Sequence, residues 1–328
     1  MGPRRRLSLL APTSHPREGT LMTISHPVSD VRTSVARTAA PVAGIVSSGV
    51  ELDVDEFGPS FGAEIRGLDV ATASDDEVRA VRQALIDYKV IVLRNQQLDD
   101  ASHIEFGNRL GDLTFGHPVW DSGDVPDEVY ELDSADNGFA DVWHTDVTFM
   151  PRPPMGSILR PVVLPRTGGD TNWADAELAY QSLSEPIRRL VDGLTAVHDG
   201  SREFGYYLKQ RRNGRGNTWD GKEVTELAPV SHPVVRVHPE TGRRSLFVNP
   251  GFTSHIEGVS EAESRGILDL LYAHITKPEH IVRHRWRLGD LVLWDNRNTL
   301  HYANRDYGDN RRVMHRITLR GDAPVGPA

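Results

Sequence analysis

Short runs of β-branched and aliphatic residues recur along most of this chain and constrain its fold more than any other feature. Val90-Ile91-Val92-Leu93 is typical, because four consecutive residues of this kind favour a buried strand. Between Val234 and Val248 the pattern predicts a hairpin that turns at Pro239-Glu240-Thr241-Gly242. Many short strands predict one β-sandwich or barrel decorated by helices. The other predicted strands are 156–164, 169–173, 233–238, 281–287, 290–295 and 312–319.

The sequence contains fewer signals for helices than for strands. Ser74-Asp75-Asp76-Glu77 is a capping box, and the apolar residues that follow it to Tyr88 have helical spacing. A second helix is predicted over 100–110, and a third begins after the capping box at Ser260. The segment 116–142 contains several Gly and Pro residues without periodicity, so it is predicted to be largely loop. The predicted fold class is mainly β with flanking helices.

The first 48 residues differ from the rest of the chain. They are rich in Ser, Thr, Pro and Ala, and an apolar run after Arg4-Arg5-Arg6 resembles a signal peptide but is cut off at Pro12. We expect residues 1–48 to be a disordered N-terminal tail. No repeat or linker is visible beyond it, so residues 49–328 are predicted to form a single domain.

Composition excludes several classes of function. With 46 acidic and 37 basic residues the net charge is −9, which argues against a general nucleic-acid binder. The chain has no Cys, which excludes disulfides, thiolate metal sites and Cys nucleophiles. No apolar run approaches the ~18–20 residues of a membrane span. We therefore expect a cytoplasmic protein with neither nucleic-acid nor membrane partners.

Among the histidines that are followed by a carboxylate two residues later, two pairs are compared as possible metal ligands. His103 and Glu105 fall in a predicted helix, where positions i and i+2 point in different directions and cannot share a small ion. His144 and Asp146 fall in an extended or loop segment, where such side chains leave the same side of the chain. Of the two pairs, only His144 and Asp146 can converge on a metal.

A distal histidine completes a possible metal site. His301 follows Trp294-Asp295-Asn296-Arg297, and two histidines with one carboxylate form the facial triad that holds non-haem Fe(II) with open positions. Arg312 can clamp a carboxylate bidentately, as a dicarboxylate co-substrate requires. Arg316 is an even number of residues from Arg312 on a predicted strand, so both should face the same side.

The chain resembles the TauD/TfdA family of Fe(II)/2-oxoglutarate-dependent dioxygenases from about residue 50 to about residue 325. The resemblance implies a double-stranded β-helix, the jelly roll of cupin-like proteins. It also implies a homo-oligomer, a dimer or tetramer. The motifs that carry the resemblance are His117-Pro118-Val119, W-H-T-D-V-T-F at 143–149, Thr167-Gly168-Gly169-Asp170-Thr171, His232-Pro233-Val234-Val235-Arg236, W-D-N-R at 294–297, H-Y-A-N at 301–304 and R-R-V-M-H-R at 311–316.

The resemblance implies a role for each matching residue. His144, Asp146 and His301 would bind Fe(II), and Thr171 and Arg312 would hold 2-oxoglutarate. His117, the backbone amide of Val147 and Arg316 would hold the sulfonate or sulfate group of a small anionic substrate. With O2, the expected products are succinate and CO2, together with an aldehyde and sulfite or sulfate.

Five positions refine this expectation. Related halogenases lack the carboxylate found here at Asp146, so this chain should hydroxylate. Taurine-specific members carry Tyr and Asn where this chain has Trp120 and Ala140. Loss of those polar groups should weaken the preference for an amine-bearing substrate. Phe204 and Phe252 are expected to extend the apolar wall, so the substrate should be a sulfonate or alkyl sulfate less polar than taurine.

Three other hypotheses stay open at the level of sequence. A carboxylate substrate, such as an aryloxyalkanoate or a biosynthetic intermediate, would suit Arg316 equally well. A metal-binding jelly roll without catalysis would not need Thr171, Arg312, His117 or Arg316. A zinc hydrolase could use the same His and Asp ligands, but not the separate dicarboxylate clamp. The segment 201–228 has little pattern and is expected to be a lid-like loop that influences substrate choice.

Overall fold

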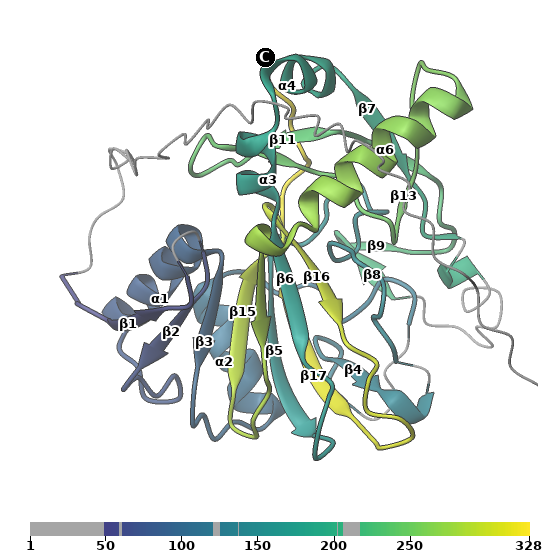
Figure 1. The fold of residues 1–328 in the computed structure, drawn as a ribbon. Helices are drawn as coiled ribbons and strands as arrows, with labels where there is room; N and C mark the ends of the chain where they lie inside the picture. The colour runs from purple at the N-terminus through teal and green to yellow at the C-terminus, as the bar shows by residue number, and fades with distance from the viewer. Residues whose placement is uncertain (1–48, 59–60, 121–124, 137, 202, 206–216) are drawn as a thin grey trace, which may run out of the picture. The chain divides into compact units, whose positions relative to one another are not determined.

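The computed structural model describes residues 49–58, 61–120, 125–136, 138–201, 203–205 and 217–328. The predicted tail, residues 1–48, lies outside these described residues. The described part is mostly β with a few helices, which confirms the coarse fold class predicted from the sequence (Figure 1). Within it, no helix is both long and apolar enough to cross a lipid bilayer.

The largest sheet has seven strands in the order β1-β2-β3-β15-β5-β17-β4. All neighbouring strands in it are antiparallel except β2 and β3, which are parallel. Its central strands therefore come from distant parts of the sequence, so the sheet can form only by long-range pairing. Its strands are β1 (Asp53–Glu56), β2 (Ala63–Arg66), β3 (Val90–Leu93), β4 (Tyr130–Asp133), β5 (Gly156–Val163), β15 (Leu291–Asp295) and β17 (Val313–Leu319).

Smaller sheets complete the β structure. One has the order β14-β6-β16 and lies alongside the central strands of the large sheet in Figure 1. A second has the order β10-β7-β13, and two strand pairs, β11-β12 and β8-β9, stand apart. Their strands are β6 (Thr171–Asp175), β7 (Thr195–His198), β8 (Thr218–Trp219), β9 (Lys222–Glu223), β10 (Val230–Pro233), β11 (Val235–Val237), β12 (Arg244–Leu246), β13 (Thr253–Ile256), β14 (Ile281–His284) and β16 (Thr299–Ala303).

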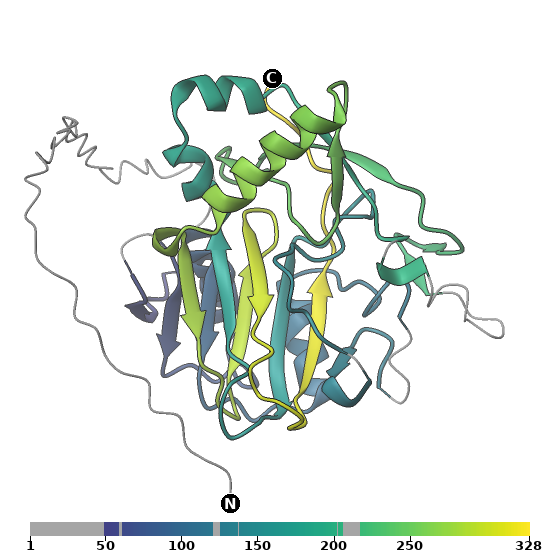
Figure 2. The ribbon, with the colours of Figure 1, turned by 45° about the vertical axis from the view of Figure 1, so that its right-hand side comes forward.

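The helices cover the sheets. The first two pack their buried faces on one side of the large sheet, and Figure 2 shows α6 lying across one end of the strands. Capping boxes begin α1, α2 and α6, as predicted for α1 and α6. The helices are α1 (Asp75–Tyr88), α2 (Asp100–Leu110), α3 (Ala176–Ser182), α4 (Glu185–Val191) and α6 (Glu261–Ile275), with 3-10 turns η1 (Ser134–Asp136) and η2 (Pro278–His280).

The centre of the large sheet is buried on both faces, which explains why β3 and residues 291–294 of β15 are continuously apolar. In β15, Leu291 and Leu293 face α1 and α2, whereas Val292 and Trp294 pack with Trp173 of β6. Successive side chains of a strand point to opposite faces. The same alternation in β5 turns Ser157 away from the helices, on the face that also carries Trp294.

The structure confirms most of the predicted elements and corrects three. The predicted strand over 281–287 ends at His284, whereas segment 116–142 is largely loop as predicted, with only β4 and η1 as regular elements among its described residues. The predicted strand over 169–173 begins later, at Thr171, because Gly168 and Gly169 adopt positive φ angles in a turn. The predicted strand over 233–238 is divided between β10 and β11 at Val234, whose backbone N–H donates to Leu194 O rather than to a β-ladder.

Candidate active site

His144 and His301 are joined by a pair of backbone hydrogen bonds. The N–H of His301 donates to His144 O at 2.7 Å, and the N–H of His144 donates to His301 O at 3.0 Å. Because His301 lies in β16, this isolated antiparallel bridge fixes the segment around His144 against a strand of the β14-β6-β16 sheet. Their rings consequently lie with centroids 4.1 Å apart.

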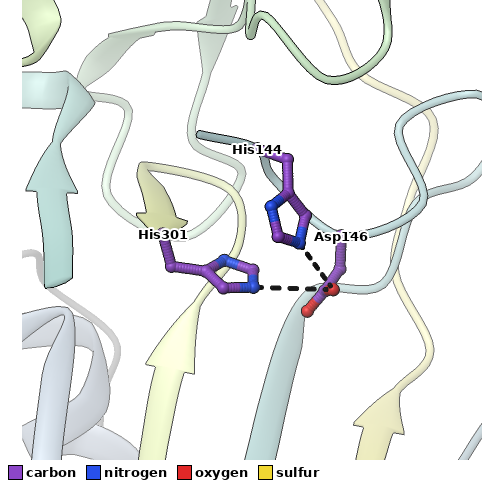
Figure 3. Close-up of side chains that lie close together, drawn as sticks. All are labelled: His144, Asp146 and His301. Atoms are coloured by element: carbon purple, nitrogen blue, oxygen red, sulfur yellow. Dashed lines mark ion pairs between the residues drawn. The ribbon is translucent and has the colours of Figure 1, made fainter. Parts of the chain in front are cut away.

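Asp146 joins the two imidazoles from the turn that follows the bridge. Its Oδ1 is 3.9 Å from His144 Nε2 and 3.8 Å from His301 Nε2, and the three side chains point toward one another (Figure 3). Asp146 and His301 are buried, and His144 is half-buried. The i, i+2 convergence of His144 and Asp146 that the sequence predicted is therefore present.

The protonation of these groups suits a metal. His144 donates Nδ1–H to Val142 O at 2.8 Å, which leaves the Nε2 lone pair facing Asp146. Burial lowers the pKa of His301 well below its usual value, so its imidazole is neutral. Burial opposes ionisation of Asp146, but the charge of Arg316 and the hydrogen bond from Ser157 hold the pKa of its carboxyl well below its usual range.

Neutral imidazole nitrogens and an ionised carboxylate oxygen are suitable ligands for a divalent transition metal. Among the described residues, the donor atoms of His144, Asp146 and His301 all lie within 4.8 Å of one another. The separations of 3.9 and 3.8 Å between Asp146 Oδ1 and the two Nε2 atoms lie below the about 4.4 Å that two ligands of one ion, each about 2.0–2.2 Å from it, can span. The three side chains come from two segments, which leaves part of the ion's surroundings facing the adjoining cavities.

A cavity of about 900 Å³ opens beside His144 and Asp146. Its lining combines Arg316 and His117 with apolar side chains and with several carboxylates, among them Asp146. Glu203 also lines it, and burial raises the pKa of that carboxyl. The predicted substrate residues all line it: His117, Trp120, Ala140, Val147, Phe204, Phe252 and Arg316.

His117 is held in one tautomer by its own loop. Its Nδ1 accepts the backbone N–H groups of Val119 at 3.1 Å and Trp120 at 2.8 Å. A neutral imidazole that accepts at Nδ1 carries its proton on Nε2. The side-chain amide of Asn217 donates to the carbonyls of His117 and Trp120 and secures the turn. The Nε2–H of His117 is thus a fixed donor on the cavity wall.

Val147 has a strained backbone beside the cavity. Its φ is +54°, a left-handed conformation that a β-branched residue rarely adopts. Val147 is buried, and its carbonyl accepts the N–H of Met150 at 3.0 Å, which closes the turn after Asp146. Strain of about 1–3 kcal/mol at such a residue persists only where the surroundings enforce it, as at ligand-binding loops.

A second, smaller cavity of about 40 Å³ lies on the other side of His301. Thr171, Arg312 and Tyr307 line it, and Arg316 lines both cavities. Both predicted co-substrate residues therefore lie beside the same histidine. The parity argument that placed Arg312 and Arg316 on one side of the chain agrees with this arrangement.

Thr171 and Arg312 are each held for binding an anion. The indole N–H of Trp286 donates to Thr171 Oγ1 at 2.9 Å, so the Thr171 hydroxyl is free to donate its own hydrogen. Arg312 donates Nε–H to Gly169 O at 3.2 Å, which fixes the guanidinium. Burial lowers the pKa of Arg312 to about 10, so it stays charged at neutral pH.

The remaining sequence predictions are resolved in part. His103 is buried in α2, and burial lowers its pKa to about 3, whereas Glu105 of the same helix is exposed; the pair shares no site, as predicted. In the expected lid over 201–228, residues 202 and 206–216 lie outside the described residues. The described remainder contains the β8-β9 pair, and Phe204 packs against His117.

Sequence reasoning did not single out Ser157, Trp286 or Tyr307. Trp286 packs in a buried apolar cluster, and its indole N–H is nevertheless the donor to Thr171. Ser157 lies in an apolar strand, where a lone hydroxyl gives no motif. Its polarity inside a run of buried apolar residues is the signal that could have identified it, because buried hydroxyls require partners.

Comparison with known proteins agrees with this geometry. A sulfate ester dioxygenase dependent on alpha-ketoglutarate, from Pseudomonas putida, is 42% identical over 281 residues, covering 84% of this chain and 92% of the relative. An alkylsulfatase from Acinetobacter baylyi is 38% identical, with 84% and 87% covered. A crystal structure of a taurine dioxygenase from Burkholderia xenovorans superposes with a TM-score of 0.71 at 40% identity, covering 84% of this chain and 91% of that one.

A model of a protein family matches most of the chain. It matches residues 53–318, a range that includes all three residues of the His-Asp-His cluster as well as Arg312 and Arg316. The chain belongs to the taurine catabolism dioxygenase TauD, TfdA family.

Proposed function

We propose that this protein is an Fe(II)/2-oxoglutarate-dependent dioxygenase that hydroxylates the carbon next to the sulfur group of an alkyl sulfate or sulfonate. The products are an aldehyde, sulfate or sulfite, succinate and CO2. One observation carries the proposal: the His-Asp-His cluster stands between two cavities, each with a buried arginine. The names of the Pseudomonas and Acinetobacter relatives favour a sulfate ester.

His144, Asp146 and His301 are the proposed iron ligands. When bound, Fe(II) with 2-oxoglutarate and O2 supplies the oxidising chemistry, which no side chain of the chain can provide. The neutral imidazole of His301 and the ionised carboxylate of Asp146 require no proton transfer before they bind a cation. Retention of the Asp146 carboxylate supports hydroxylation rather than halogenation.

Thr171 and Arg312 are the proposed binding residues for the distal carboxylate of 2-oxoglutarate. The guanidinium forms charge-assisted hydrogen bonds, and the Thr171 hydroxyl donates another because Trp286 already occupies its acceptor side. Burial strengthens both interactions and excludes water from them.

His117, the Val147 amide and Arg316 are the proposed site for the sulfate or sulfonate group. A tetrahedral anion accepts hydrogen bonds from several directions, which suits an imidazole N–H, a backbone N–H and a guanidinium. Trp120, Ala140, Phe204 and Phe252 supply the apolar wall for the carbon chain. This binding places the carbon next to sulfur or oxygen toward the metal ligands.

The proposal also includes the domain structure, the oligomeric state and the location of the protein. We propose that residues 49–328 form one catalytic domain whose large sheet and β14-β6-β16 sheet are the halves of a double-stranded β-helix. The packing of Trp294 in one sheet on Trp173 in the other, with ring centroids 5.7 Å apart, supports this. Assembly as a homo-oligomer and a cytoplasmic location belong to the same proposal.

Anaerobic titration tests the cofactors, and a product assay tests the substrate. Fe(II) and 2-oxoglutarate added to the apo-protein should produce a weak visible charge-transfer band. Hexyl sulfate, hexanesulfonate and phenoxyacetate are then supplied with O2. Succinate matched by sulfate from hexyl sulfate supports the proposal. If only phenoxyacetate is oxidised together with succinate formation, the proposed substrate class changes from a sulfur anion to a carboxylate. Absence of the charge-transfer band would overturn the dioxygenase assignment.

Substrate preference should change when two wall residues become polar. We expect Trp120→Tyr combined with Ala140→Asn to raise the ratio of kcat/KM for taurine over hexyl sulfate by about tenfold or more, because each change adds a partner for the amine. Kinetics with both substrates measures this ratio. Ala135→Asn is the control, since it adds an amide elsewhere on the same cavity wall. An unchanged ratio in the double variant would contradict the assignment of this wall.

Co-substrate binding should depend on Trp286. We expect Trp286→Phe to raise KM for 2-oxoglutarate by about 3–10-fold, because loss of one neutral hydrogen bond leaves the Thr171 hydroxyl free to turn away. Steady-state kinetics at saturating Fe(II) measures the change. Trp219→Phe removes an indole donor to Arg152 O in another buried region and should leave this KM unchanged. Equal effects of the two variants would refute the role of Trp286.

A further inference from the structure

Three buried side chains form a hydrogen-bonded series that ends on Asp146. The indole N–H of Trp294 donates to Asn296 Oδ1 at 2.9 Å, and Asn296 Nδ2 donates to Ser157 Oγ at 2.8 Å. The Ser157 hydroxyl donates to Asp146 Oδ2 at 2.6 Å. All four residues are at most 2% exposed, so water does not compete for these bonds.

The chemistry of the groups allows only one direction along this series. An indole nitrogen can donate but never accept, so Asn296 must turn its oxygen toward Trp294 and its amino group toward Ser157. Ser157 Oγ therefore accepts from Asn296 and must use its single hydrogen for Asp146. The result is a donor fixed on Oδ2, while Oδ1 is the oxygen that lies near both imidazoles.

Strand pairing holds the series in place. Trp294 of β15 is the register partner of Ser157 in β5. The N–H of Asn296 donates to Met155 O at 2.9 Å, which continues the pairing of the same two segments by one more residue. The orientation of Asp146 is thus set by the large sheet, whereas His144 and His301 are set by the bridge at β16.

We propose that Ser157 and Asn296 are positioning residues that hold the Asp146 carboxylate with Oδ1 toward the metal. This inference rests on the proposed function, because it assigns the role of the same metal cluster. Arg316 also contacts Asp146, through Oδ1, so Ser157 is the side chain that fixes the other oxygen. Without the Ser157 hydroxyl, Oδ2 is left buried without that donor, and the carboxylate is held at Oδ1 alone. Outer partners of metal ligands generally change metal affinity by about 10–100-fold.

Direct metal binding to the full-length apo-protein tests the proposal. Mn²⁺ is the probe, and its dissociation constant is measured by calorimetry without 2-oxoglutarate or substrate. Ser157→Ala should weaken binding by about 10–100-fold, and Asn296→Leu should weaken it by about 3–10-fold because Ser157 keeps its hydroxyl. In turnover, the Fe(II) concentration at half-maximal rate should rise by the same factor while KM for 2-oxoglutarate changes less than about twofold.

Two matched variants separate positioning from general destabilisation. Ser157→Thr keeps the hydroxyl and should restore Mn²⁺ affinity to within about threefold of the unmodified protein. Ser245→Ala removes an equally buried hydroxyl, whose donated hydrogen bond goes to Arg297 O at 3.0 Å, away from both cavities. It should lower thermal stability without changing Mn²⁺ affinity.

Each outcome has a distinct meaning. Weaker binding in Ser157→Ala with rescue by threonine and no effect of Ser245→Ala supports the positioning role. Equal Mn²⁺ affinity of Ser157→Ala and the unmodified protein overturns this inference and leaves the proposed function intact. Equal losses in Ser157→Ala and Ser245→Ala overturn it as well. Failure of the unmodified protein to bind Mn²⁺ overturns the metal site itself and therefore the proposed function.

Discussion

Asp146→Ala should eliminate both metal binding and turnover. We expect kcat/KM for the sulfur substrate to fall by more than about 100-fold, because loss of a ligand exceeds the effect of losing an outer partner. The substitution also leaves the buried guanidinium of Arg316 without the carboxylate that it contacts. Mn²⁺ calorimetry and succinate formation measure the two effects separately.

A second carboxylate provides the control for this variant. Glu105 also stands two residues after a histidine, but it is exposed on α2. Glu105→Ala should therefore retain metal affinity and turnover within about twofold, as is usual for surface substitutions. Turnover by Asp146→Ala within tenfold of the unmodified protein would show that Asp146 is not a ligand.

Arg312→Ala should raise KM for 2-oxoglutarate by about 100-fold, and Arg312→Lys by about tenfold. Hydrogen bonds to charged groups contribute about 1.5–3 kcal/mol, and lysine keeps the charge but loses the planar pair of donors. Because burial lowers the pKa of this guanidinium only to about 10, the binding of 2-oxoglutarate should persist up to that pH and weaken above it. Steady-state kinetics from neutral to alkaline pH measures both effects.

Arg320→Ala is the matched control for the arginine variants. Arg320 follows β17, is exposed and pairs with Asp220 at 3.6 Å. Its loss should leave KM for 2-oxoglutarate unchanged. If Arg312→Ala behaves like Arg320→Ala, the small cavity does not bind the distal carboxylate, and the co-substrate must bind elsewhere.

The sequence predicted correctly those helices and strands that a short local pattern specifies. The capping boxes at Ser74 and Ser260 and the apolar run of β3 each specify their element within a few residues. By contrast, α3 and α4 have seven residues each, too few for a clear helical period. Tyr130–Asp133 becomes β4 only because it pairs with β17, a strand far along the chain.

The residues of the candidate site also differ in whether a local sequence pattern could identify them. The proximity of His144 and Asp146 follows from their spacing in an extended segment, which any reader of the sequence can derive. The position of His301 depends on a backbone bridge that leaves no local pattern, so the sequence could suggest it only from the ligand chemistry of two histidines with one carboxylate and from the family resemblance. The contribution of Ser157 depends on the register of β5 against β15, which composition and spacing do not reveal.

The bridge between His144 and His301 also links metal occupancy to folding. The ligands come together only after distant parts of the chain have paired, so an unfolded chain offers no preformed site. A ligand that binds only the folded state stabilises it by RT ln(1 + [L]/Kd), which is about 2.7 kcal/mol at a hundredfold excess over Kd. Iron supply would then govern the lifetime of this enzyme as well as its rate, and iron-starved protein would be the more readily unfolded and degraded form.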